Sequence, residues 1–123
     1  MEQKNIIHSV EDLKVYQKAK SVFEEFLSED LPVFYKTLAG RWLGAHQLRT
    51  LDSICANMEE GFARKFGKEF KQFLRMSRGS TGEAKGRYKR CQKILPPDMV
   101  EKRIKQLDEI QAMLHVLIAK LKD

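Results

Sequence analysis

The chain contains few of the residues that mark several common classes of protein. Its two cysteines, Cys55 and Cys91, stand far apart, with no cysteine or histidine at metal-ligand spacing. Neither a disulfide framework nor a zinc site is therefore expected. Both cysteines fall at apolar helical positions, and we interpret them as small buried side chains.

Long apolar runs are also absent. No segment approaches the ~20 apolar residues that span a bilayer, and residues 1–7 lack the apolar stretch of a secretory signal. We therefore expect a cytoplasmic protein with no membrane partner. A length of 123 residues, 42% of them hydrophobic and 33% charged, predicts one globular domain over residues 1–123, with a disordered or frayed N-terminus at about residues 1–8.

Catalytic motifs are missing from the sequence as well. It has no glycine-rich phosphate loop, nucleophile elbow or HExxH helix, and no helix shows the Glu-x-x-His signature of a di-metal bundle. Asp52, Asn57, Glu59 and Glu60 cluster at the end of one predicted helix, where such polar groups more often hold a neighbouring helix or pair with arginine. We expect no enzyme activity, no catalytic residue, no metal and no cofactor.

Apolar residues recur at spacings of three and four, which predicts amphipathic helices. The first helix begins at a capping box, Ser9 followed by Asp12, and ends near Pro32. Its apolar face comprises Leu13, Tyr16, Phe23, Phe26 and Leu27. The second helix runs from about Leu31 or Pro32 to Phe62. Its apolar residues are Leu38, Trp42, Leu48, Leu51, Ile54, Cys55 and Met58, while Gly40 and Gly44 leave open a kink or a frayed first half before His46.

A third and a fourth helix follow. Gly61 and Gly67 bracket the exit from the second helix, and Lys68 opens the third. Pro96 and Pro97 break the chain before the fourth helix, because proline lacks an amide donor. The apolar stripe of the fourth helix comprises Val100, Ile104, Leu107, Leu114, Leu117, Ile118 and Leu121. Four such helices joined by short turns predict an all-α, antiparallel up-and-down four-helix bundle.

Positive charge is concentrated in one segment of the chain. Residues Arg64 to Lys93 hold eleven of the 23 lysines and arginines against only Glu69 and Glu83, a net charge of 11 − 2 = +9. The remainder of the chain balances at 12 − 15 = −3, for a total of +6. A local cationic surface of this kind indicates a polyanionic partner.

Around the third helix these charges form a stripe opposite the apolar one. The side expected to face the core carries Phe66, Phe70, Phe73, Ser77, Thr81, Ala84, Tyr88, Cys91 and Leu95. The opposite side carries Lys68, Lys71, Arg75, Gly79, Gly82, Gly86, Arg90 and Lys93. Each glycine within a helix costs about 1 kcal/mol relative to alanine. Three glycines on the outer side therefore indicate a surface that something approaches closely.

Three interpretations of this surface remain open. In the first, nucleic-acid phosphates contact Lys68, Lys71, Arg75, Arg78, Lys85, Lys89, Arg90 and Lys93. In the second, Gly79, Gly82 and Gly86 form a contact between copies of the chain, and the cations meet an acidic protein. In the third, the charges only solvate an exposed helix. Base readout is not expected, because few aromatic residues lie near the basic stripe.

Several short motifs together resemble one known family. They are Glu11-Asp12-Leu13-Lys14-Val15-Tyr16-Gln17-Lys18-Ala19, Ser53-Ile54 through Asn57 to Glu60-Gly61-Phe62, Lys68-Glu69-Phe70, Phe73-Leu74-Arg75, and Arg78-Gly79-Ser80 with Glu83. From about His8 to Lys122 the chain resembles the 23S rRNA-intervening-sequence proteins, which are small bacterial four-helix bundles.

The resemblance implies a non-enzymatic bundle, with a homopentamer as the expected assembly. Related accessory proteins of diversity-generating retroelements share the pentameric form and bind a reverse transcriptase and nucleic acid. A reverse transcriptase and RNA are therefore the partners that the resemblance implies for this chain.

The sequence departs from the family pattern at three positions in the second helix. Cys55 stands where a proline usually follows the Ser-Ile pair, Glu59 replaces the usual alanine before Glu60, and Asp52 occupies a position that is commonly small and apolar. Loss of the proline predicts a straighter second helix.

Overall fold

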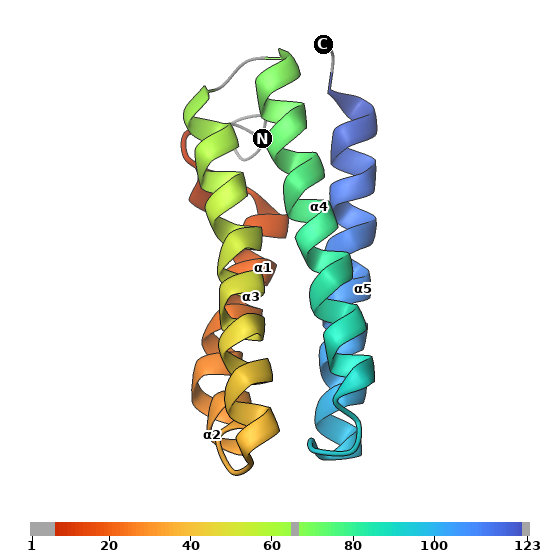
Figure 1. Ribbon diagram of the computed structural model, residues 1–123. Coiled ribbons are helices and arrows are strands. Elements are labelled where there is room, and N and C mark those ends of the chain that lie inside the picture. Colours follow the sequence, from red (N-terminus) through yellow and green to blue (C-terminus); the bar gives the residue numbers. More distant parts are fainter. Residues whose placement is uncertain (1–6, 65–66, 122–123) are drawn as a thin grey trace.

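The computed structural model describes residues 7–64 and 67–121, which form four helical rods running alternately up and down (Figure 1). The first rod is composite, with α1 (Lys14–Glu25), a π-helical turn (Phe26–Asp30) and α2 (Leu31–Phe34) in succession. The other rods are α3 (Leu38–Arg64), α4 (Gly67–Arg90) and α5 (Pro97–Lys120). The predicted all-α, antiparallel up-and-down bundle is confirmed.

The helices pack in a fixed order around the core. α4 packs between α3 and α5, whereas α1 packs against the opposite sides of α3 and α5, so α1 and α4 lie diagonally across the bundle. Buried apolar side chains from all four rods meet in the centre, among them Phe26, Ile54, Leu74 and Leu107. Each such side chain stabilises the fold by about 1.5–3 kcal/mol.

The first rod differs from its prediction at both ends. The backbone N–H groups of His8 and Ser9 donate to Asp12 Oδ2 at 2.8 and 3.1 Å, but this cap belongs to a short 3-10 turn, Val10–Asp12. The long helix begins only at Lys14. Pro32 does not end the rod, because the chain widens into the π-helical turn just before it and continues to Phe34.

The start of α3 is continuous rather than frayed or kinked. Gly40 and Gly44 are buried there, against Phe34 of the preceding rod. A Cβ on Gly40 would lie 1.9 Å from the Phe34 carbonyl oxygen, and one on Gly44 would lie 2.7 Å from Phe34 Cβ. These glycines therefore allow α2 and α3 to pack closely where the chain reverses. The helix also runs through Cys55 without a break.

Three residues that the sequence placed on apolar faces are instead exposed. The side chains of Leu38 and Trp42 in α3 are 74% and 69% exposed, and Leu27 in the π-helical turn is 42% exposed. The second helix begins after the turn at residues 35–37, so its first turn extends beyond the core that the later turns cover.

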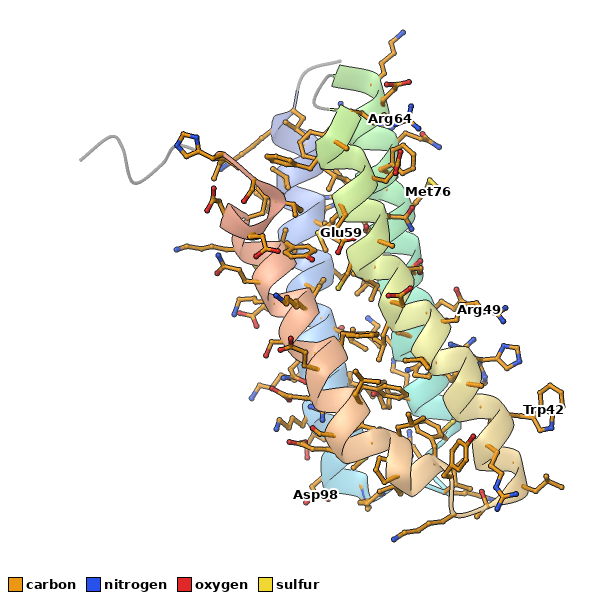
Figure 2. All side chains as sticks on the ribbon, turned by 90° about the vertical axis from the view of Figure 1, so that its left-hand side faces the viewer. Trp42, Arg49, Glu59, Arg64, Met76 and Asp98 are labelled. Carbon is orange, nitrogen blue, oxygen red and sulfur yellow. The ribbon has the colours of Figure 1, made fainter. Side chains whose placement is uncertain are left out.

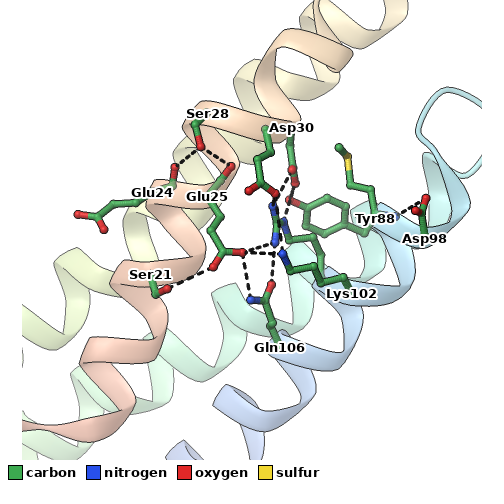
Figure 3. Close-up of polar contacts among 12 residues, drawn as sticks. Ser21, Glu24, Glu25, Ser28, Asp30, Tyr88, Asp98, Lys102 and Gln106 are labelled. Carbon is green, nitrogen blue, oxygen red and sulfur yellow. Dashed lines mark hydrogen bonds and ion pairs between the residues drawn. The ribbon is translucent and has the colours of Figure 1, made fainter.

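A buried ionic cluster joins three of the rods (Figure 3). The guanidinium of Arg103 in α5 is fully buried and donates to both oxygens of Asp30 at 2.9 Å. It also donates to Glu25 Oε1 at 2.6 Å and to Glu29 Oε1 at 2.8 Å. The Tyr88 hydroxyl of α4 donates to Asp30 at 2.5 Å. Burial is the largest single influence and lowers the pKa of Arg103, but the hydrogen bonds to Asp30 and Glu29 and the negative charge of Asp30 together outweigh it and raise that pKa.

Arg103→Met should lower the free energy of unfolding by about 3 kcal/mol or more, because the buried Asp30 carboxylate would lose its cation. Urea unfolding followed by circular dichroism measures the loss. Lys102→Met is the matched control, since Lys102 pairs with Glu25 at 3.4 Å but its side chain is 54% exposed. The control should cost less than about 1 kcal/mol. Equal losses in the two variants would contradict the role assigned to the cluster.

Candidate nucleic-acid interface

The side of α4 that faces away from the bundle carries the predicted glycines and most of the predicted cations. We call this surface the outer face: Lys68, Arg75, Gly79, Gly82, Gly86, Lys89, Arg90 and, in the turn after α4, Lys93. The opposite side of α4 is buried, as predicted, at Ser77, Thr81, Ala84 and Tyr88. Phe70 and Phe73 are half-buried, and Phe66 lies outside the described residues.

Five of the eight predicted phosphate-contacting residues project into solvent from the outer face. They are Lys68, Arg75, Lys89, Arg90 and Lys93. Among the residues that the structure describes, no carboxylate lies within 4.0 Å of any of their charged groups. Their positive charge is therefore available to an external anion.

The other three predicted residues lie on the side of α4 that approaches α5. Lys71 is half-buried. Arg78 Nη1 lies 3.4 Å from His115 Nδ1, at the edge of a surface hollow that both residues line. Lys85 Nζ donates to Asp108 Oδ1 at 2.7 Å and to Gln111 Oε1 at 3.1 Å. The charge of Lys85 is thus already matched by a carboxylate on α5.

Two further arginines of the basic segment have structural roles, of which the sequence indicated only the pairing of Arg64 with a glutamate at helical spacing. Arg87 is 7% exposed, and its guanidinium donates to Gln47 at 2.7 Å and to Thr50 at 2.8 Å, both on α3. Arg64 pairs with Glu60 at 2.9 Å. The net charge of +9 counted along the segment therefore overstates the charge that the surface presents.

The three predicted glycines all lie outside the core, in different surroundings. A Cβ on Gly79 would meet nothing within 4 Å, whereas one on Gly82 would lie 3.1 Å from Gln111 Nε2 and one on Gly86 would lie 3.5 Å from Arg90 Nη1. At Gly79 the helix backbone is open to a partner. At Gly82 a side chain of α5 restricts the space for a partner.

Among the polar residues near the end of α3, Glu59 bonds to α1, whereas Asn57 bonds within its own helix. The Tyr16 hydroxyl donates to Glu59 Oε2 at 2.6 Å, and Asn57 Nδ2 donates to the backbone of its own helix at Ser53. Asp52 is exposed. Across residues 7–64 and 67–121, no group of three or more acidic, histidine or cysteine side chains is arranged to hold a metal ion.

The cysteines are free and buried, as the sequence predicted. Burial raises the pKa of the Cys55 thiol to about 12. A thiol of that pKa stays protonated and unreactive near neutral pH. The described helices include none that is both long and apolar enough to cross a membrane.

Gly79→Ala should stabilise the protein by about 0.5–1 kcal/mol, because alanine favours the helix and its methyl group would enter open space. Gly40→Ala should destabilise it, because the added methyl group would collide with the Phe34 carbonyl. Thermal unfolding of both variants tests the contrast. A lower melting temperature for Gly79→Ala would show that the outer face at this position is not open.

Comparison with known proteins identifies one family. The model of a family described as 23S rRNA-intervening sequence protein matches residues 11–116, which extend from the 3-10 turn before α1 into the last turns of α5. No curated protein and no solved structure matches the chain. The family indicated by the short motifs is therefore confirmed.

Proposed function

This chain belongs to the 23S rRNA-intervening sequence protein family, and we propose that it is a non-enzymatic, homo-oligomeric bundle that binds nucleic acid, preferably RNA, through the outer face of α4. The observation that carries this proposal is the set of five exposed cations without a carboxylate partner among the described residues. The preference for RNA rests on the family.

The spacing of the cations suits a polyanionic chain. Lys68 and Arg75 lie near one end of α4, and Lys89, Arg90 and Lys93 lie at and just beyond the other end. At 1.5 Å per residue, the helix from Lys68 to Arg90 extends about 33 Å. Between the two groups lies the glycine segment, where a sugar-phosphate backbone can approach the helix without meeting side chains. Contacts of this kind bind phosphates without reading sequence.

Binding should depend steeply on salt, because each neutralised phosphate releases counterions. Affinity for a single-stranded oligoribonucleotide should fall by about 300-fold between 50 and 200 mM salt if about six phosphates are engaged. A triple variant, Arg75→Gln, Lys89→Gln and Arg90→Gln, should bind more weakly and with a shallower salt dependence. Fluorescence anisotropy measures both effects.

The matched control removes three charges from the diagonally opposite rod, by Lys14→Gln, Lys18→Gln and Lys20→Gln. All three lysines are exposed on α1. Both triple variants change the net charge equally, so a general loss of attraction would affect them alike. The proposal requires the α4 variant to lose much more affinity than the α1 variant. Absence of binding by the unmodified protein at 50 mM salt would overturn it.

The second candidate function is a homo-oligomeric scaffold or accessory protein that binds a protein partner such as a reverse transcriptase. The open backbone at Gly79 favours it, because side-chain-free positions allow two helices to approach closely. A pentamer is the assembly that the family resemblance suggests. The two functions are compatible if a ring of subunits aligns several outer faces around one channel.

Gly79→Leu should separate the two uses of the outer face, since the added side chain extends into open space and leaves the fold intact. Loss of the oligomer with normal helix content would favour a subunit contact at Gly79. An unchanged oligomer with weaker RNA binding would favour close approach by nucleic acid. Light scattering and anisotropy supply the two readouts. Gly82→Leu is a poorer choice, because its Cβ would already lie 3.1 Å from Gln111.

A further inference from the structure

The single tryptophan of the chain lies on the surface. Trp42, in the first turns of α3, is 69% exposed, and Leu38, one turn earlier on the same side, is 74% exposed. The indole therefore contributes little to the core. A large aromatic side chain left in solvent indicates a surface with a binding role.

Trp42 lies at the same level of the bundle as the C-terminal end of α4, although the two are far apart in sequence. Gln47 Nε2 donates to the Ala84 carbonyl at 2.9 Å, and Arg87 donates to Thr50, so α3 and α4 run antiparallel in this register. The residues that precede Gln47 therefore continue alongside those that follow Arg87. Figure 2 shows Trp42 and Arg49 pointing outward on the same side of the bundle.

The surroundings of Trp42 are cationic. Residues 31–51 contain no aspartate or glutamate, and neither do residues 84–97. Exposed Arg49 lies two turns after Trp42 on α3, and Lys89 and Arg90 lie at the adjoining end of α4. Arg41 is exposed too, but its guanidinium lies over the Tyr35 ring. The ring of His46 stacks on the indole, with centroids 6.4 Å apart and an interplanar angle of 25°. An exposed aromatic ring bordered by cations fits a molecule that is both planar and anionic.

We propose that Trp42 is a stacking platform for an unpaired nucleobase of a single-stranded nucleic acid whose phosphates contact Lys89, Arg90 and Lys93. This inference rests on the proposed nucleic-acid function. It adds that the ligand is single-stranded near this end of α4, because neighbouring base pairs cover both faces of a base inside a duplex. Stacking of this kind tolerates any base, so no sequence readout is implied.

Charge disfavours a contact at this surface between two copies related by a twofold axis. Such a contact would place one acid-free, cationic surface against an identical one, and like charges would oppose each other. A nucleic acid supplies the opposite charge and the aromatic ring together. Trp42 was not associated with the basic stripe in the sequence, because it lies on another helix and joins the stripe only through packing.

The fluorescence of Trp42 tests the proposal directly, since no other tryptophan contributes. At 50 mM salt, a single-stranded oligoribonucleotide should quench the emission, whereas an abasic oligomer of equal length and charge should bind without quenching it. Trp42→Ala should weaken binding of the base-containing strand by about 5- to 100-fold and leave binding of the abasic strand unchanged. Leu38→Ala is the matched control, because it removes an equally exposed side chain without a ring.

The possible failures can be told apart. Salt-sensitive binding with unchanged emission, and with equal affinity for the Trp42→Ala variant, would overturn the stacking platform but leave the proposed function standing. Absence of binding by every oligonucleotide would overturn both. A blue-shifted emission before RNA is added, combined with a smaller particle by light scattering for Trp42→Ala, would show that a second copy covers the indole. Circular dichroism of both variants shows that the bundle is intact.

Discussion

The contact between α3 and α4 determines what this protein shows to solvent. The buried Ser77 hydroxyl donates to the Ile54 carbonyl at 2.8 Å, and Ser53 donates to Ser80 at 2.7 Å. With the Gln47 and Arg87 contacts, these bonds hold α4 in one rotation about its own axis. Because a helix turns about 100° per residue, a rotation by one residue would bury cations and expose the core stripe. The direction in which the outer face points thus depends on polar groups at the contact between α3 and α4.

The cluster around Arg103 links the remaining rods. Asp30 at the end of the π-helical turn is fully buried, and Arg103 of α5 and Tyr88 of α4 both donate to it. A buried charge of either sign would be costly alone, so the cluster is stable only when all three segments are docked. The irregular turn before α2 thereby acquires a defined position, and the close packing of Phe34 on the glycines of α3 follows from it.

The basic residues of α4 fall into two groups: some contact other helices and support the fold, and others are exposed to solvent and can contact a partner. Lys85 reaches Asp108 on α5, which matches its charge. Arg87 donates to the neutral Gln47 and Thr50 on α3, and Glu83 of its own helix matches its charge. Lys89 and Arg90, only two to five residues further on, face solvent. The proposed binding surface is therefore smaller than the basic segment. It extends instead onto α3, where Trp42 and Arg49 face the same side.

The sequence alone determined the helices, their antiparallel order, the family and the outward placement of the glycines, because each depends on the local period of apolar and polar residues. It was misleading at Pro32, where a π-helical turn accommodates the proline, and at Trp42, whose apolar character suggested burial. Only the tertiary structure decided that Arg103 lies in the core, that Asp108 matches Lys85, and that Trp42 is exposed at the level of the C-terminal end of α4. The reason is physical: helical periodicity places a side chain on its own helix, whereas its partners are set by the register between helices far apart in the chain.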